Sequence, residues 1–283
     1  MARIGHNPLN NKPAPHRTSD MVLMAITHLP NTQGYHLHRL EVIKKCLLSM
    51  RDNAKTKCDV MIWDNGSCDE LRDWLKNDYK PSALVFSENV GKSAGRLGLL
   101  GMVTPETIVN ISDDDIYYYP DWLSPQIDLL KNIPNVSSVT GYPIRTSFRW
   151  ATENTIYRMQ KAGAIITRGK IMPEQWEKDF CISIGREWEA HKAGTIKDFD
   201  IIATYNNRKF FLTSHHCQFV GYAGLLRAAA LDTLMLGCMS DEKPFDTMLD
   251  KMGNRIATIE RRTRHIGNII DEGLRIDIEN AER

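Results

Sequence analysis

Residues 107–123 read TIVNISDDDIYYYPDWL, and this stretch decides the fold. The apolar run 107–111 predicts a buried strand. It leads directly into three adjacent aspartates, Asp113, Asp114 and Asp115, which we call the acidic triplet. Pro120 suits the first position of a helix, because its missing N–H would have no partner there. A strand, an acidic loop and a helix in this order are typical of an α/β sheet that carries a polar site at a strand end.

The rest of the first half repeats this pattern. Short apolar runs at 21–26, 60–63, 83–86 and 136–140 predict further strands, each followed by a polar loop or a turn. Ser67 with Glu70 three residues later predicts a capping box at the start of a helix. Alternating strands and helices favour a mostly parallel central sheet flanked by helices. Because ligands bind at the carboxyl ends of such strands, we expect Asp64, Asn89 and the acidic triplet to converge.

The bulk properties fit one large α/β domain. We expect residues 1–20 to form a flexible or extended arm, and residues 21–283 to form a single domain. Lys and Arg number 36 against 35 Asp and Glu, which gives no argument for nucleic-acid binding. The six cysteines form no C-x-x-C pair, so we expect buried free thiols and a reducing compartment. No apolar run is long enough to span a bilayer, and no secretory signal is visible. We therefore expect a cytoplasmic protein, either free or peripheral at the inner membrane face.

Three adjacent carboxylates repel one another, and a divalent cation offsets that repulsion most directly. In an extended segment residues i and i+2 point the same way, so Asp113 and Asp115 can face one ion while Asp114 turns elsewhere. Oxygen ligands suit Mn²⁺ or Mg²⁺. The alternative is a solvated loop whose acids favour a helix N-terminus.

Three stretches together resemble glycosyltransferases of the GT-A fold, especially the family 2-like group. They are VMIWDNGSCDE at 60–70, NVGKSAGRLG at 89–98 and NISDDDIYYYPDWL at 110–123. The resemblance covers roughly Met21 to Leu130. It implies a GT-A type nucleotide-diphospho-sugar transferase fold. It also implies a nucleotide-diphosphate sugar donor, with a UDP-sugar favoured over a GDP-sugar, and a Mn²⁺ or Mg²⁺ cofactor.

The resemblance also implies roles for individual residues. It places Asp64 against the uracil or ribose of the donor. The other donor-binding residues that it implies are Thr27, His28, Asn89, Gly91, Arg96, Asp113 and Asp114. RHIGN at 264–268 resembles a late His-x-Gly element, in which the His completes the metal shell or contacts the diphosphate. The metal ligands would then be Asp113, Asp115 and His265. The alternatives are a tight turn at Asp64, an exposed helical residue for Arg96 and a packed or surface histidine for His265.

The second half should supply a general base, because inverting transfer must deprotonate the acceptor hydroxyl. The candidates are Asp241, Glu242 and Asp246, with Asp241 our first choice and Glu242 our second. The alternative is that all three are acids at the N-terminus of a helix, where they are favourable. We expect a helix near 173–192, and acceptor-side roles are open for Arg145, Arg149 and Trp150. Tyr117, Tyr118, Tyr119 and Trp122 would stack on a sugar or pack in the core. His215, His216 and Cys217 suggest zinc, but no second pair of ligands matches them, so we assign no metal there.

The sequence therefore predicts a metal-dependent glycosyltransferase that moves a sugar, with inversion, to a hydroxyl acceptor. Residues 21–140 would be the nucleotide-sugar-binding half and residues 141–283 the acceptor-binding half. The acceptor is a glycan, a lipid-linked sugar or a protein, and the oligomeric state is open. The alternatives are a sugar-nucleotide nucleotidyltransferase and a non-catalytic nucleotide- or carbohydrate-binding module on the same fold.

Overall fold

The computed structural model describes residues 19–195, 199–235 and 242–282. In these ranges the strands are β1 (Met21–Thr27), β2 (Asp59–Asn65), β3 (Ala83–Ser87), β4 (Ile108–Ser112), β5 (Ile116–Tyr118), β6 (Val136–Thr140), β7 (Ile165–Gly169), β8 (Asp200–Tyr205), β9 (Arg208–Phe211), β10 (Gln218–Tyr222), β11 (Asn254–Thr258) and β12 (Thr263–His265). The α-helices are α1 (Arg39–Asp52), α2 (Asp69–Trp74), α3 (Lys92–Gly101), α4 (Leu123–Asn132), α5 (Glu153–Lys161), α6 (Glu174–Ser183), α7 (Trp188–Thr195), α8 (Ala223–Met235), α9 (Glu242–Met252) and α10 (Glu272–Glu282).

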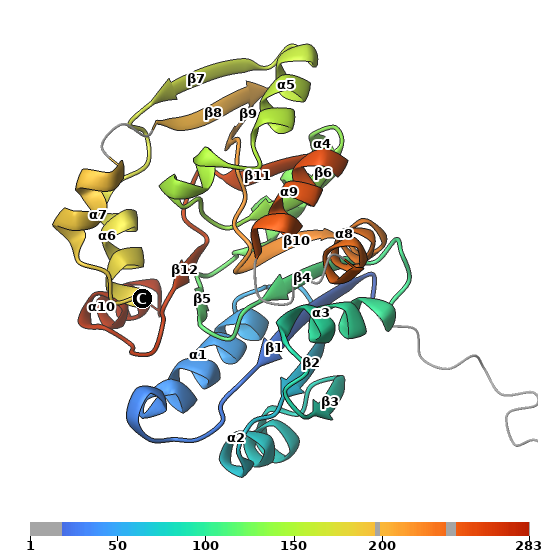
Figure 1. The fold of residues 1–283 in the computed structure, drawn as a ribbon, viewed down its shortest axis with the longest axis vertical. Coiled ribbons are helices and arrows are strands. Elements are labelled where there is room, and N and C mark those ends of the chain that lie inside the picture. Colours follow the sequence, from blue (N-terminus) through green and yellow to red (C-terminus); the bar gives the residue numbers. More distant parts are fainter. Residues whose placement is uncertain (1–18, 196–198, 236–241, 283) are drawn as a thin grey trace, which may run out of the picture.

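A large sheet runs through the molecule in the order β3-β2-β1-β4-β10-β6-β11-β9-β8-β7 (Figure 1). The first four strands in this order are parallel, and so is the pair of β6 and β11. β10 lies antiparallel between β4 and β6, and antiparallel pairs also join β11, β9, β8 and β7. The expected α/β architecture with helices on both faces of a central sheet is confirmed.

Alternation along β1 explains why helices cover both faces. Met21, Leu23 and Ala25 join a core cluster with residues of α1, α2 and α4. Their neighbours in the strand join a second cluster with α3, α8 and α9 on the opposite face. Successive side chains of a strand point to opposite faces, and here both sets are apolar and buried. Such a strand belongs at the centre of a doubly covered sheet.

Two pairings outside the parallel region bring the second half of the chain to the acidic triplet. β12 pairs with β5 in a separate two-stranded sheet, in which His265 lies opposite Ile116. β10 pairs with β4, in which Gln218 lies opposite Ser112. The triplet joins β4 to β5. It therefore lies between β10 and β12, the two strands by which the second half of the chain reaches it.

Several local predictions need correction. Ser67 does not cap a helix: α2 begins at Asp69, and the Ser67 hydroxyl accepts a hydrogen bond from the backbone N–H of Leu29 (3.0 Å). Pro120 precedes α4, which begins three residues later. The helix expected near 173–192 is two helices, α6 and α7, because Gly185 adopts a positive φ of 64° between them.

Two further observations concern membrane-spanning helices and the state of the cysteines. No helix among the described residues is long and apolar enough to cross a bilayer. The described cysteines are free thiols; Cys46, Cys181 and Cys217 are buried, while Cys58 and Cys68 are partly exposed. Cys238 lies outside the described residues.

Candidate active site

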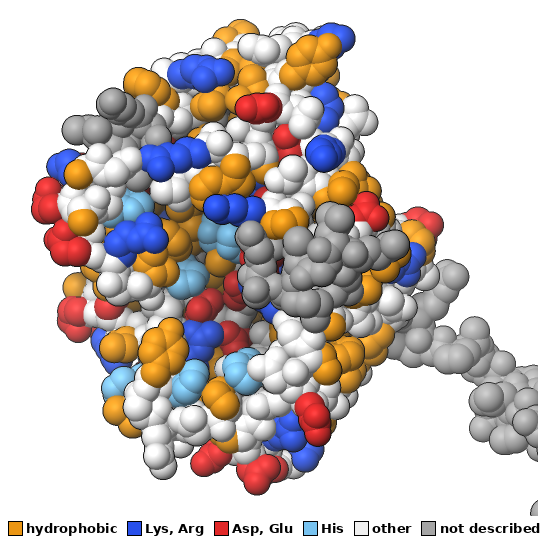
Figure 2. Space-filling view, in the orientation of Figure 1, with side chains coloured by type: hydrophobic (Ala, Val, Ile, Leu, Met, Phe, Trp, Pro, Cys, Tyr) orange, Lys and Arg blue, Asp and Glu red, His pale blue; other side chains and the backbone are white. Residues whose placement is uncertain are grey.

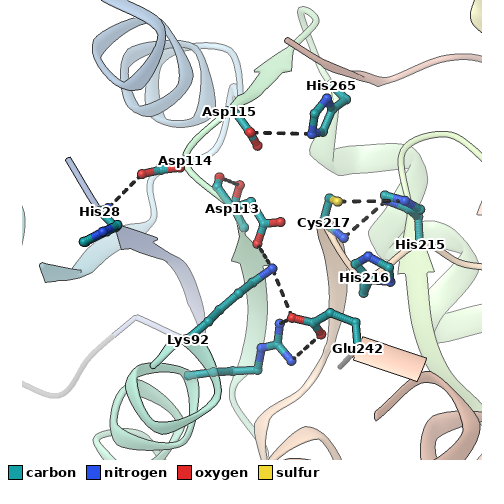
Figure 3. A network of polar contacts seen from close by, with 12 residues as sticks. His28, Lys92, Asp113, Asp114, Asp115, His215, His216, Cys217, Glu242 and His265 are labelled. Atoms are coloured by element: carbon teal, nitrogen blue, oxygen red, sulfur yellow. Dashed lines mark hydrogen bonds and ion pairs between the residues drawn. The ribbon is translucent and has the colours of Figure 1, made fainter. Parts of the chain in front are cut away.

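The acidic triplet is held at both ends by backbone hydrogen bonds to the second half of the chain. The N–H of Asp113 donates to the carbonyl of Cys217 (2.8 Å), and the N–H of Ile266 donates to the carbonyl of Asp115 (2.7 Å). These bonds continue the β4–β10 and β5–β12 ladders. The three carboxylates therefore lie where two strand pairs meet (Figure 3).

Asp114 turns toward the first strand. Its Oδ2 accepts a hydrogen bond from the backbone N–H of His28 (2.9 Å), just after β1, and its Oδ1 pairs with Arg39 at the start of α1. Burial raises the pKa of Asp114, and Arg39 offsets part of that rise. Asp114 thus ties the end of β1 and the start of α1 to the triplet.

Asp115 faces the late His-x-Gly element. Its Oδ2 lies 2.9 Å from Arg39 Nη1 and 3.5 Å from His265 Nε2. Burial pushes the pKa of Asp115 up, but His265 and Arg39 outweigh it, so the pKa is lowered and the group is an anion. Its Oδ1 is buried and accepts no hydrogen bond within the described part of the chain.

Asp113 faces the other side of the site. Lys92, the first residue of α3, places its Nζ 2.6 Å from Asp113 Oδ1 and 3.1 Å from Glu242 Oε1. Arg96, one turn later, binds both oxygens of Glu242 at 3.0 and 3.1 Å. Burial raises the pKa of Glu242, but Arg96 and Lys92 outweigh it and hold that pKa well below its usual range. Asp113, Lys92, Glu242 and Arg96 form one charge network.

A cavity of about 910 Å³ opens beside the triplet. Figure 2 shows acidic, basic and histidine side chains gathered around a hollow near the middle of this face. Of the residues predicted from sequence, it is lined by His28, Asn89, Asp113, Asp114, Asp115 and His265. Its other walls include Tyr35, Ile182, Ile184 and Ile269. A cavity of this volume is within the range for small-molecule sites.

Some residues that were predicted to bind the sugar donor do not line the cavity. Asp64 is fully buried, and its carboxylate binds the Thr27 hydroxyl (3.2 Å), the Ser67 N–H (3.2 Å) and Arg72 Nε (2.8 Å). Asp64 therefore orders the loop after β2. Asn65, its neighbour, does line the cavity and connects His28 to Asn89: its carbonyl binds His28 Nδ1 (2.8 Å) and its Nδ2 donates to Asn89 Oδ1 (2.9 Å).

Gly91 and Arg96 also stand outside the cavity lining. Gly91 is the N-cap of α3 and has a φ of 86°, a conformation that favours glycine. Arg96 is 1% exposed, so it is not the exposed helical residue considered from sequence. Its partner is Glu242, and it sits over the ring of Phe245 with its Cζ 4.5 Å from the ring centroid.

Sequence reasoning missed Arg39, Lys92 and Asn65, all of which line the cavity. One signal for Lys92 was available. A cation at the first residue of a helix opposes the helix dipole, which favours anions there. Such a local conflict indicates a partner of opposite charge, here Asp113.

Several of the remaining aromatic and basic candidates are buried. Tyr117, Tyr118 and Trp122 are buried, and Tyr118 packs against Trp122 with ring centroids 4.5 Å apart. Arg145 is buried against Glu177 and Asp200 and does not line the cavity. A sugar-stacking role for these tyrosines is therefore excluded by their burial, whereas Tyr119 is partly exposed.

The residues around Asp115 fit a divalent cation. Asp115 Oδ1 is a buried anionic oxygen that accepts no hydrogen bond from the described residues. His265 Nδ1 lies 2.7 Å from the Ser183 hydroxyl, which leaves its Nε2 directed at Asp115. A hydrogen bond to the ring nitrogen that faces away from a metal fixes the tautomer of a metal-binding histidine. Figure 3 shows Asp113 and Asp115 extending to one side of the triplet and Asp114 to the other.

His215, His216 and Cys217 place ligand atoms within 4.8 Å of one another. The Cys217 N–H donates to His215 Nδ1 (3.2 Å), so the proton of a neutral His215 is on Nε2. Burial lowers the pKa of His215 well below its usual range, which keeps the ring neutral. With one ring nitrogen accepting and the other protonated, His215 has no lone pair free for a metal, and we assign none here.

The three predicted bases differ in surroundings. Glu242 is held by two cations, and Asp246 is 2% exposed with its Oδ1 2.6 Å from Arg255 Nη2. Asp241 lies outside the described residues. The fold brings together the acidic triplet, His265 and the start of α9. The cavity is not lined by Thr27, Asp64 or Arg96, which instead contact the residues that form the site.

No curated protein matches the sequence significantly. Solved structures with partial similarity include mannosyltransferase PcManGT from Pyrobaculum calidifontis in complex with GDP-Man and Mn²⁺, at 21% identity and a TM-score of 0.35, covering 50% of this chain and 41% of that chain. Another is S. aureus TarS 1–349, at 19% identity and a TM-score of 0.32, covering 42% and 34%. The chain thus spans less than half the length of either.

The family assignment rests on a sequence model. The model of glycosyl transferase family 2 matches residues 37–188, a range that contains β2 to β4, α1 to α3 and the acidic triplet. The mixed sheet with parallel β3-β2-β1-β4 and the triplet at the end of β4 is the GT-A type fold that the sequence resembles. The chain belongs to glycosyl transferase family 2.

Proposed function

We propose that the protein transfers a sugar from a nucleotide-diphosphate sugar to a hydroxyl acceptor, with inversion, and that Asp113, Asp115 and His265 hold a Mn²⁺ or Mg²⁺ ion. The observation that carries the proposal is the acidic triplet in the lining of the cavity, where Asp115 Oδ1, which has no hydrogen-bond partner among the described residues, lies on the same carboxylate that faces His265. Family membership gives the reaction class.

The nucleotide-sugar half, residues 21–140, binds the donor. Asn65, Asn89 and His28 offer amide and imidazole groups along one wall of the cavity. Asp64, Thr27 and Gly91 shape the loops that present them, which is a supporting role rather than the direct contact expected for Asp64. A UDP-sugar is our first choice of donor and a GDP-sugar the second.

The leaving diphosphate needs positive charge. Arg39 and Lys92 line the cavity on either side of the triplet and supply two fixed cations. A bound Mn²⁺ or Mg²⁺ would add Lewis-acid stabilisation of the departing diphosphate. Fixed charges aimed at a group that becomes more anionic in the transition state lower the barrier without reorganisation.

The test combines binding and turnover. Melting temperatures are measured with UDP, GDP, CMP and dTDP, each with Mn²⁺, Mg²⁺ or a chelator, for the wild type and Asp115→Asn. The matched control is Asp128→Asn, an exposed aspartate that pairs with Arg208 outside the cavity. A ligand at 100 times its Kd stabilises the native state by about 2.7 kcal/mol.

We expect metal-dependent stabilisation by one nucleotide in the wild type and the control, and its loss in Asp115→Asn. Release of that nucleoside diphosphate from its sugar donor, assayed over a panel of glycan, lipid-linked and protein acceptors, then tests transfer. Binding without release of nucleotide with any acceptor favours a non-catalytic module. No stabilisation by any pair contradicts the proposal.

A further inference from the structure

One wall of the cavity is apolar and exposed. It consists of four large side chains, which we call the apolar wall: Tyr35, Ile182, Ile184 and Ile269. Their exposed fractions are 79, 59, 39 and 58%, in the same order. Hydrophobic side chains also border the hollow in Figure 2, among the charged ones. Apolar side chains that gather at an exposed site mark a surface that binds a ligand or a partner, so the apolar wall is a candidate binding surface.

Three segments that are far apart in the sequence form the apolar wall, and hydrogen bonds hold them together. The Nδ2 of Asn268 donates to the carbonyl of Tyr35 (3.3 Å), which joins the turn after β12 to the turn before α1. His265 Nδ1 lies 2.7 Å from the Ser183 hydroxyl, which joins β12 to the end of α6. In Figure 1 the end of α6 and β12 lie together above α1. The apolar wall is therefore one surface that the fold assembles.

The apolar wall adjoins the proposed reaction centre. The Nε2 of His265 lies 3.5 Å from Asp115 Oδ2, and Ile269 follows His265 by four residues. The wall and the acidic triplet line the same cavity. A molecule that rests on the apolar wall therefore reaches the groups proposed to act on the donor. The wall thus belongs to a substrate site and not to a distant docking surface.

The apolar wall suits a different chemical group from those of the donor. A nucleotide-diphosphate sugar presents charges, amides and hydroxyls, and the cavity offers it Asn65, Asn89 and the cations Arg39 and Lys92. Isoleucine side chains form no hydrogen bonds, so a hydroxyl pressed against them loses water without gaining a partner. An apolar chain has no such cost, and it gains by leaving water. The group that the wall fits is therefore a hydrocarbon.

The exposure of the apolar wall favours a long hydrocarbon over a short one. Each of its side chains is more than a third exposed, so the wall is reached from outside and a bound chain can continue beyond the protein. A small compact group, such as an aromatic ring linked to a sugar, is bound best where the site encloses most of its surface. An open wall beside a polar cavity fits a lipid whose polar head enters the cavity.

We propose that the acceptor is a lipid-linked sugar, with its hydrocarbon chain on the apolar wall and its hydroxyl-bearing head beside the acidic triplet. The inference rests on the glycosyl transfer proposed above, and it selects the lipid-linked class from among glycan, lipid-linked and protein acceptors. The first carbons of the chain contact the apolar wall, and the rest of the chain extends away from the protein.

Binding is tested by calorimetry without donor, using maltose and octyl, decyl and dodecyl maltoside below their micelle concentrations. The variants are Ile182→Thr, Ile269→Thr and the double variant. Both side chains are exposed, so these changes should leave the fold intact. The matched control is Ile165→Thr, an isoleucine that is 71% exposed on β7 and lies outside the cavity lining.

Turnover is tested separately on the same proteins. Release of nucleoside diphosphate is measured with the donor identified above, and each sugar acceptor is offered free, as its decyl glycoside and as its p-nitrophenyl glycoside. The ratio of kcat/KM between the decyl-linked and the free sugar reports the contribution of the chain alone, because the sugar is the same in both.

In the wild type we expect affinity to rise with chain length, by up to about fourfold for each methylene that the wall covers. Ile182→Thr and Ile269→Thr should each weaken dodecyl maltoside binding about three- to tenfold, and the double variant should flatten the dependence on chain length. The decyl glycoside should have a higher kcat/KM than the free sugar in the wild type and in Ile165→Thr. The double variant should lose that preference and keep its kcat/KM for the free sugar.

The outcomes separate this inference from the proposed function. A wild type that binds no sugar nucleotide, or binds one without turnover on any acceptor, overturns the acceptor assignment together with the transfer on which it rests. Turnover that is equal on free and decyl-linked sugars, or best on p-nitrophenyl glycosides, overturns the lipid class alone. Equal affinity for octyl and dodecyl maltoside, or an equal loss of affinity in Ile165→Thr, also overturns it, because the chain would then not bind at the apolar wall.

Discussion

The buried pair of Arg96 and Glu242 gives a prediction that can be worked out from distances. Arg96→Met removes a bidentate contact of 3.0 and 3.1 Å from a side chain that is 1% exposed. Methionine can occupy the space over Phe245, so the change chiefly removes charge and leaves Glu242 with less compensation. The expected result is a folded protein of lower stability.

The magnitude follows from what remains around Glu242. Breaking a buried pair by removing one partner costs about 3–5 kcal/mol, because an uncompensated charge is left. Glu242 keeps Lys92 at 3.1 Å and is 17% exposed, so we expect a smaller loss, about 2–3 kcal/mol. For a chain of this size that corresponds to a fall in melting temperature of roughly 3–5 °C.

The assay is a double-mutant cycle by thermal or urea unfolding, using Arg96→Met, Glu242→Gln and the double variant. Because the double variant removes both charges of the pair and Lys92 keeps Asp113 as its partner, its stability should return to within about 1 kcal/mol of the wild type. A double variant that loses the sum of the two single effects would refute the reasoning, since the two residues would then be uncoupled.

Acid adds an independent check on the same pair. The pKa of Glu242 in the folded protein is below its ordinary value of 4.5. The pair therefore stabilises the fold fully above that ordinary pKa, and the stabilisation is lost as pH falls through the folded pKa. The stability difference between wild type and Glu242→Gln should shrink on acidification below about pH 4.5. A difference that grows with acid would reverse the sign and contradict the assignment.

Three further substitutions test the supports of the site. Ser183→Ala should weaken Mn²⁺ binding about 10- to 100-fold by calorimetry, because the Ser183 hydroxyl fixes the His265 tautomer; unchanged affinity would exclude that role. Gly98→Ala should lower the melting temperature even though alanine is the better helix former, because its Cβ would lie 2.4 Å from the Trp63 ring; a rise would show that the ring moves aside. Gly267→Ala should severely reduce folded yield, since φ is +74° and its Cβ would lie 1.8 Å from the Ser183 carbonyl; a stable variant would mean that the end of α6 can shift.

The sequence was informative where structure is local. β1 to β4 are short apolar runs that end in polar loops, so both the strands and the convergence of Asn89 with the acidic triplet could be predicted. The same logic placed Asp64 near the donor, but it could not show that Thr27, Ser67 and Arg72 occupy its carboxylate. A side chain after a strand can turn into the cavity or under it, and the pattern does not distinguish the two.

The parts that were missed depend on pairing between distant segments. Arg39 meets Asp115 because β12 and β5 bring the Gly267–Asn268 turn over α1, where Arg39 also binds the Gly267 carbonyl (2.9 Å). The acidic triplet was expected to need a metal for its neutralisation, yet Arg39 and Lys92 already supply part of it. A sequence pattern cannot predict this charge compensation, because the two cations and the acidic triplet come from three separate elements.

The antiparallel insertion of β10 has a consequence for how the protein is made. When the ribosome has finished residue 140, β4 has its parallel neighbour β1 on one side and an open edge on the other, because β10 covers that edge only with residues 218–222. Exposed strand edges recruit other strands. About 80 more residues must be added at roughly 5–20 residues per second, so the nascent chain carries this edge for several seconds. Pausing between 140 and 222 should therefore favour aggregation more than pausing after it.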